Sequence, residues 1–219
     1  MNFASYSPPR DQGLDIVYRD EAIIVLNKPA GLLAVPGRGT DKQDSLFVRI
    51  KHDFADALVV HRLDMATSGL MVFARGADIQ RRLSQMFREQ EVNKRYVAVV
   101  AGKMERTDDE VNLPIVADWP NRPLRKIDIG SGKPSLTRFR VLIYDADTDT
   151  SRVELEPVTG RTHQLRVHMA AIGHPIMGDV LYGSVAGAST GRLLLHASQL
   201  SFAHPLSEMP LGWVSEPPF

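Results

Sequence analysis

The stretch HRLDMATSGL places three chargeable side chains, His61, Arg62 and Asp64, within four positions. A carboxylate beside an arginine in a loop is a candidate reactive pair, because loops held by a rigid sheet concentrate functional groups. The same residues also fit a simpler role, since Asp and Thr commonly cap turns. Taken alone, this stretch favours the turn-capping interpretation, so the rest of the chain has to decide.

A second stretch, VTGRTHQLRVHMAAIGHPIMGD, concentrates arginines and histidines in a segment with helical character. On a helix, Arg166 shares a face with Met169 and Ala170. If it enters a cleft it needs an acidic partner, because a buried unpaired charge is costly, and Asp64 is a candidate. Otherwise Arg166 is a surface arginine. A metal site is not expected, because HExxH is absent and His163 and His168 are five residues apart.

Two further groups of side chains have both structural and functional interpretations. Tyr96 opens the β-rich run in KRYVAVVAG. It is either half-buried packing with a hydrated hydroxyl or a ring that stacks on a flat ligand. The segment WPNRPLRK clusters Arg122, Arg125 and Lys126. These cations either contact phosphates or form a solvated face.

Composition excludes several classes of protein. The 219 residues contain no cysteine, so disulfides, thiolate zinc sites and cysteine nucleophiles are excluded. The formal net charge is zero, which argues against uniform electrostatic binding of nucleic acid but leaves local basic patches open. No apolar run approaches the ~20 residues of a membrane span, and the N-terminus does not resemble a signal peptide. A cytoplasmic protein that does not bind membranes is predicted. HRLD is superficially similar to the HRD motif of protein kinases, but the chain has neither their glycine-rich loop nor DFG. The GxSxG pattern of serine hydrolases and the P-loop pattern are also absent, so these classes are poorly supported.

The elements that would position these residues follow from periodicity and turn signals. Strands are predicted over 14–18, 22–26, 58–60, 70–74, 96–101, 137–144, 152–155, 193–195 and 200–203. Helices are predicted from 44 to 50 with Asp44 as the cap, around 79–87, and over 162–172. Residues 1–13 are predicted to form a loose arm, followed by a single domain over 14–219. This pattern predicts an α+β fold on a mainly antiparallel sheet, with Asp64 in a loop between two strands.

Four ordered motifs between about residues 18 and 183 resemble those of the pseudouridine synthases, and within them the ribosomal large subunit pseudouridine synthase A group. They are YRDEAIIVLNKPAGLLAVPG, HRLDMATSGLMVFAR, KRYVAVV and GRTHQLRVHMAAIGHPIMGD. Leu165 replaces the isoleucine usual in the last motif. Many relatives carry an N-terminal S4-like RNA-binding domain, which is not expected here because the first motif begins near residue 18. The resemblance implies a pseudouridine synthase fold over 14–219.

The resemblance also implies roles for individual residues. Asp64 would be the nucleophile, Arg166 would pair with it, and Tyr96 would lie against the uracil ring. Arg62 would fill the gap that a flipped base leaves, since a guanidinium can stack and donate hydrogen bonds in its place. His61 and Leu165 are assigned to substrate binding.

The implied reaction converts uridine to pseudouridine in structured RNA, with 23S rRNA and the tRNA anticodon arm as substrates. Uracil leaves C1′ of the ribose, rotates and rejoins through C5. Because no redox step occurs, no cofactor is expected, and no metal is expected. The alternative is a non-catalytic RNA-binding or RNA-folding module that retains the fold. Intact Asp64, Tyr96 and Arg166 speak against it, since binding alone does not require them.

Overall fold

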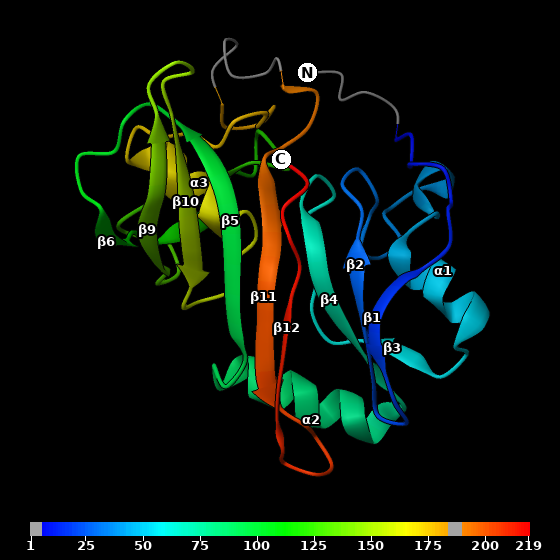
Figure 1. The fold of residues 1–219 in the computed structure, drawn as a ribbon. Helices are drawn as coiled ribbons and strands as arrows, with labels where there is room; N and C mark the ends of the chain where they lie inside the picture. Colours follow the sequence, from blue (N-terminus) through cyan, green and yellow to red (C-terminus); the bar gives the residue numbers. More distant parts are fainter. Residues whose placement is uncertain (1–5, 184–189) are drawn as a thin grey trace. The chain divides into compact units, whose positions relative to one another are not determined.

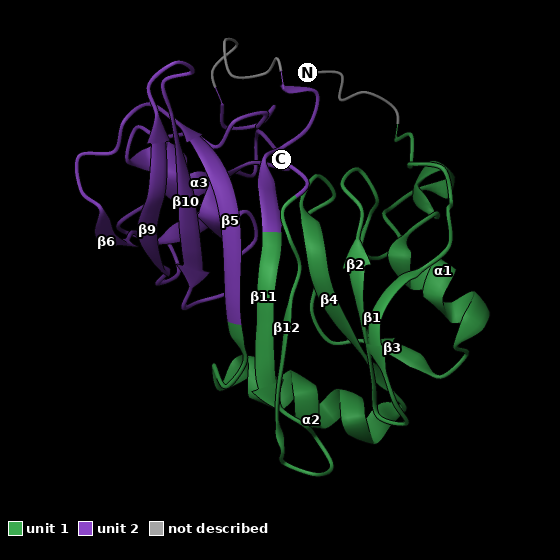
Figure 2. Cartoon of the chain, in the orientation of Figure 1, with its two compact units in different colours: residues 1–93, 197–217 green, residues 94–196, 218–219 purple. Residues whose placement is uncertain are grey.

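The computed structural model describes residues 6–183 and 190–219 (Figure 1). The chain forms two compact units (Figure 2). Unit 1 comprises residues 1–93 and 197–217, and unit 2 comprises residues 94–196 and 218–219. The chain passes between the units at three points, 93/94, 196/197 and 217/218, all inside the range 14–219 that the sequence analysis treats as one domain. Residues 1–5 and 184–189 lie outside the described residues.

Unit 1 is built on a sheet with the strand order β1-β2-β4-β11, with β3 paired to β4 and β12 to β11. The strands are β1 (Asp15–Arg19), β2 (Ile23–Lys28), β3 (Ala57–Val59), β4 (Ser68–Arg75), β11 (Leu195–Ala203) and β12 (Pro210–Val214). The helical segments are η1 (Thr40–Lys42), α1 (Leu46–Asp53) and α2 (Ala77–Arg88). The strands predicted over 14–18 and 22–26 are confirmed, and they pair antiparallel as β1 and β2.

The core of unit 1 lies between the sheet and α2. Ile79 and Leu83 are the buried residues of α2. They pack in one cluster with Val25 of β2 and Val72 of β4. The predicted helix around 79–87 is therefore confirmed, because apolar residues at helical spacing face this sheet.

Unit 2 contains four neighbouring strands of the main sheet, a separate β-hairpin and a buried helix. The sheet order is β5-β10-β9-β6. Its strands are β5 (Asn93–Ala101), β6 (Asp108–Asn112), β9 (Leu136–Asp145) and β10 (Thr150–Pro157). The hairpin pairs β7 (Ile115–Ala117) with β8 (Arg125–Ile127), and the helix is α3 (Gln164–Ala171). Residues 164–169 of α3 are all buried.

The predicted fold class, α+β on a mainly antiparallel sheet, is confirmed. Strands pair antiparallel in β1–β2, β2–β4, β3–β4, β11–β12, β5–β10, β9–β10, β6–β9 and β7–β8. Within the described residues, no helix has the length and hydrophobicity that crossing a lipid bilayer requires.

Three predicted boundaries are wrong, each for a local reason. The cap of α1 is Ser45, whose Oγ accepts a hydrogen bond from the Val48 N–H at 3.3 Å, and not Asp44. Helix α3 begins at Gln164 and not at 162, because His163 has a left-handed φ of 59°. The two strands predicted over 193–195 and 200–203 are replaced by one longer strand, β11, which begins at Leu195 and runs without interruption to Ala203. The polar residues that interrupt its apolar pattern, His196 and Ser198, are buried within it.

Candidate active site

Asp64 lies in the loop that joins β3 to β4 and is partly exposed. The Thr67 N–H donates to the Asp64 carbonyl at 3.1 Å and closes a turn. On the neighbouring residue, the Met65 carbonyl accepts the Gly31 N–H at 2.9 Å and Lys28 Nζ at 3.0 Å. The backbone that follows the Asp64 side chain is therefore held by hydrogen bonds at two successive carbonyls.

Lys28 is the buried group that fixes this turn, and the sequence analysis did not single it out. Lys28 is the last residue of β2 and is only 1% exposed. Nζ donates to the carbonyls of Pro29 at 2.8 Å, Leu32 at 2.7 Å and Met65 at 3.0 Å. A buried ammonium is costly unless its donors are satisfied. These bonds therefore tie residues 29–32 to the turn that carries Asp64.

The glycine of HRLDMATSGL, Gly69, is required by its backbone conformation and by a close neighbour. Its φ is +109°, which a residue with a side chain rarely adopts. A Cβ at this position would lie 2.4 Å from the Ala197 carbonyl oxygen. Glycine therefore allows β4 to approach the backbone of β11 closely, five residues after Asp64.

The structure gives His61 a packing role and leaves Arg62 at the surface. His61 Nε2 accepts the Val72 N–H of β4 at 3.0 Å. Its ring stacks on Phe87, with 4.6 Å between the ring centroids. The His61 side chain thus accepts a backbone N–H of β4 at a position just after the end of β3. Arg62 is exposed. The assignment of both residues to substrate binding stays a prediction.

In unit 2, Arg166 forms a buried two-bond ion pair with Asp179. Arg166 Nε and Nη2 each donate to an Asp179 carboxylate oxygen at 2.7 Å. The side chains are 4% and 0% exposed. Asp179 also accepts the N–H groups of Leu181 and Tyr182 at 2.9 and 3.1 Å. Burial alone would raise the pKa of Asp179, but the hydrogen bond and charge of Arg166 outweigh it and lower that pKa.

Tyr182 extends this network. The Arg166 guanidinium lies 5.2 Å from the centre of the Tyr182 ring. The Tyr182 hydroxyl lies 2.7 Å from His163 Nδ1 and accepts the Arg125 N–H at 2.8 Å. Arg166 is thus held by an anion and a ring. Neither Asp179 nor Tyr182 was singled out from the sequence, although the motif GHPIMGD contains the aspartate.

The remaining polar residues of α3 serve the interior of unit 2. His168 Nδ1 lies 2.9 Å from Thr137 Oγ1, and its Nε2 lies 2.9 Å from the Leu113 carbonyl oxygen. Burial lowers the pKa of His168, so the neutral imidazole is favoured. Leu165 is 6% exposed. In the described part of the chain, no group of three or more His, Cys, Asp or Glu side chains is arranged to hold a metal ion.

Tyr96 lies on β5, opposite Leu155 of β10, and is partly exposed. It belongs to unit 2 with Leu165 and Arg166, whereas Asp64 belongs to unit 1. The structure therefore brings His61 and Arg62 together with Asp64 in one unit, and the other three predicted site residues lie in the second. The pairing of Asp64 with Arg166 joins different units and stays a prediction.

Comparison with known proteins agrees with this arrangement of motifs. Residues 22–171 match the RNA pseudouridylate synthase family. The dual-specificity RNA pseudouridine synthase RluA of Escherichia coli (strain K12) is 50% identical over 206 residues, which are 94% of each chain. The Pasteurella multocida protein of the same name is 47% identical over the full length of both chains.

Two solved human structures resemble the fold. Human RNA pseudouridylate synthase domain containing 1 has a TM-score of 0.80 and 31% identity, covering 97% of this chain and 87% of its own. Human RNA pseudouridylate synthase domain containing 4 has a TM-score of 0.73 and 26% identity, covering 93% and 88%. The resemblance of the motifs is thereby confirmed, and a non-catalytic binding module is not favoured. This chain belongs to the RNA pseudouridylate synthase family and is an RNA-modifying isomerase.

Proposed function

We propose that this enzyme converts specific uridines to pseudouridine in 23S rRNA and in the tRNA anticodon arm, with Asp64 as the nucleophile. The motifs resemble a group with these two substrates, and the E. coli relative is described as dual-specificity. The observation that carries the proposal is the Asp64 turn, whose backbone is fixed by Lys28 and Gly31. Because both substrates are cytoplasmic RNAs, we also propose a cytoplasmic location.

In the proposed reaction, the bond between C1′ and N1 of uridine breaks with participation of the Asp64 carboxylate. The released uracil rotates, a bond forms between C1′ and C5, and the C5 proton leaves. The Tyr96 hydroxyl is a candidate acceptor for that proton. N1, which keeps the electron pair of the broken bond, takes up a proton in exchange, so the product is an isomer of uridine and no oxidant or reductant is required. A carboxylate that forms a covalent intermediate splits one difficult step into two easier ones.

Arg166 would keep Asp64 ionised, since a nearby guanidinium favours the charged carboxylate. A guanidinium has five N–H donors in a rigid fork. Asp179 accepts bonds from Nε and Nη2, which fixes the orientation of the guanidinium that we propose to pair with Asp64. Asp179 would then act as a positioning residue that aims Arg166.

RNA binding would involve Arg62 and the hairpin of β7 and β8. Arg62 is exposed in the Asp64 loop, where it can occupy the gap left by a flipped base. In the hairpin, Arg122 lies 3.2 Å from the centre of the Trp119 ring, and Trp119 is 66% exposed. Arg125 Nε is buried without a hydrogen-bond partner among the described residues.

The decisive experiment measures tritium release from RNA labelled at uracil C5, because that hydrogen leaves only if C5 becomes bonded to C1′. The wild-type enzyme should release tritium from labelled 23S rRNA fragments and from tRNA. Asp64→Asn should bind the same RNA and release none, because an amide of the same shape is a poor nucleophile. Release by Asp64→Asn at a rate near that of the wild type would remove Asp64 from the mechanism. Tight RNA binding by the wild type without any release would instead support a binding module.

A further inference from the structure

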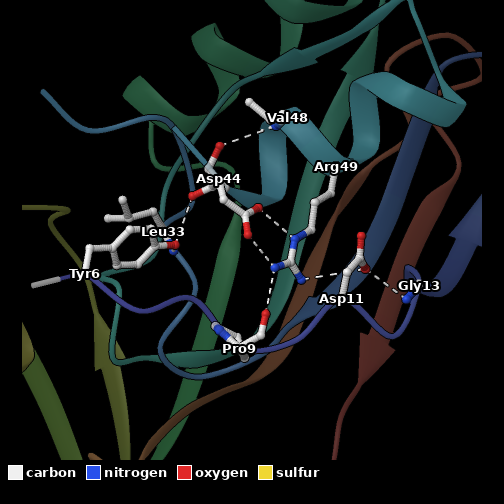
Figure 3. A network of polar contacts seen from close by, with 9 residues as sticks. Tyr6, Pro9, Asp11, Gly13, Leu33, Asp44, Val48 and Arg49 are labelled. Atoms are coloured by element: carbon white, nitrogen blue, oxygen red, sulfur yellow. Dashed lines mark hydrogen bonds and ion pairs between the residues drawn. The ribbon is translucent and has the colours of Figure 1, made fainter. Parts of the chain in front are cut away.

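The N-terminal segment 6–13, here called the strap, forms neither helix nor strand, yet it is hydrogen bonded to unit 1 (Figure 3). The Tyr6 hydroxyl donates to the Asp44 carbonyl at 2.9 Å and accepts the Leu33 N–H at 3.0 Å. A single hydroxyl thus joins the strap to two separate points of the segment between β2 and α1. The sequence predicts a loose arm over 1–13, of which residues 1–5 lie outside the described residues.

Arg49 of α1 holds the other end of the strap (Figure 3). Its Nε and Nη2 donate to the Asp44 carboxylate at 2.9 and 2.7 Å, and Nη2 also donates to the Pro9 carbonyl at 2.7 Å. Nη1 lies 3.7 Å from Asp11. The hydrogen bond to Asp44 raises the pKa of Arg49, whose side chain is only 10% exposed. A nearly buried guanidinium with this many acceptors has little freedom to move.

The strap contacts the same short segment that fixes the Asp64 turn. Pro9 Cδ lies 3.8 Å from the position that a Cβ on Gly31 would take. The Gly31 N–H donates to the Met65 carbonyl, and the Leu32 carbonyl accepts Lys28 Nζ. The next residue after Leu32 is Leu33, whose N–H donates a hydrogen bond to the Tyr6 hydroxyl. Contacts therefore run without a break from the strap through residues 31–33 to the residue next to Asp64.

We infer that the strap positions the nucleophile: it presses residues 31–33 against the turn that carries Asp64, and Tyr6 is its main positioning residue. This inference rests on the proposed role of Asp64. Tyr6 touches neither Asp64 nor substrate in this scheme and acts only through the backbone of Leu33 and Gly31. Loss of its hydroxyl should loosen the turn and leave the RNA-binding surfaces in place.

The test compares Tyr6→Phe with Tyr18→Phe. Tyr18 is a matched control, because its hydroxyl also makes a hydrogen bond, to Asp20 at 2.8 Å. Tyr18 lies on β1 opposite Val25, and Asp20 precedes β2, whereas Lys28 is the last residue of β2. For Tyr6→Phe we expect kcat for pseudouridine formation to fall about tenfold with KM unchanged, since small misplacements of a reacting group have effects of this size or larger. For Tyr18→Phe we expect no change in kcat.

Amide hydrogen exchange gives a readout that does not depend on turnover. The Gly31 and Thr67 N–H groups keep their acceptors in Tyr6→Phe, so faster exchange at both would show that the loosening reaches the Asp64 turn. Tyr18→Phe should leave both unchanged. If Tyr6→Phe does not fold, Pro9→Ala removes the ring beside Gly31 and keeps the carbonyl that Arg49 binds, with the same expected results.

A folded strap variant with wild-type kcat, or with wild-type exchange at Gly31 and Thr67, would overturn the inference. Failure of the proposed function looks different. In that case the wild-type enzyme itself forms no pseudouridine, while the exchange of the two amides still reports whether the strap holds the turn.

Discussion

Replacing Asp179 by asparagine tests the buried network around Arg166. The asparagine side chain would keep the shape of the aspartate but lose its charge, and its amide nitrogen would face a donor. The present carboxylate accepts four hydrogen bonds, two from Arg166 and one each from the N–H groups of Leu181 and Tyr182. Removing one partner of a buried ion pair leaves an uncompensated charge and costs about 3–5 kcal/mol.

This cost has measurable consequences for stability. The free energy of unfolding from urea titrations at pH 7 should fall by about 3–5 kcal/mol. For a chain of this size each kcal/mol lowers the melting temperature by about 2–4 °C, so it should fall by about 6–20 °C. Turnover should fall as well, because Arg166 loses the partner that orients it.

Asp56→Asn is the matched control. Asp56 also binds an arginine through two bonds, from Arg75 Nε at 3.0 Å and Nη2 at 3.4 Å. Those side chains are 46% and 31% exposed, so the pair should contribute less than about 1 kcal/mol. If Asp179→Asn cost no more than Asp56→Asn, the reasoning from burial would be refuted.

The pH dependence gives a second check on Asp179. Its pKa in the folded protein is lowered from 3.8, so between the two values the unfolded chain binds more protons. Stability therefore rises with pH in that range. The contribution of Asp179 is fully present above pH 3.8 and is lost as the pH falls through the folded pKa. The difference in stability between the wild type and Asp179→Asn should shrink over the same range, and a constant difference would contradict the ion pair.

Three further predictions concern the site and its substrate. Arg166→Lys should lower the rate of tritium release although it keeps the charge, because an ammonium cannot reproduce the two parallel bonds to Asp179. A wild-type rate would contradict this role of the guanidinium. Gly69→Ala should give little folded protein in a thermal melt, because its Cβ would lie 2.4 Å from the Ala197 carbonyl oxygen. Gly76→Ala is the control: its φ is also positive but its Cβ would have open space, so it should lower the melting temperature less. An isolated anticodon stem-loop should be modified nearly as fast as intact tRNA, with a salt slope of about one unit or less per phosphate neutralised. An inert stem-loop would show that recognition depends on distant RNA structure.

Local sequence signals predicted most elements of the fold. Ile79 and Leu83 lie at helical spacing and are the buried residues of α2. The strands over 137–144 and 152–155 flank an acidic turn and pair antiparallel as β9 and β10. These signals are reliable because the period of a helix or strand and the chemistry of a turn act over only a few residues.

Predictions that depended on which polar side chains bind each other were less successful. Asp44 and Ser45 are both good caps by residue type, and the choice was made by Arg49, which binds the Asp44 carboxylate. The same limit applies to Arg166. The sequence analysis reasoned that a buried arginine needs an acid, but only the folded unit identifies Asp179 as an acid that binds it.

The sequence by itself determined the family, the α+β class and the residue types available for chemistry, because ordered motifs and periodic patterns are written along the chain. The tertiary structure decided how those residues are held. Lys28 and Met65 are 37 positions apart, and Tyr6 and Leu33 are 27 apart, yet each pair shares a hydrogen bond. Such bonds form only after strands and loops have packed. Because an unsatisfied buried donor is costly, it forms a hydrogen bond with an acceptor that packing brings close, whatever their separation along the chain.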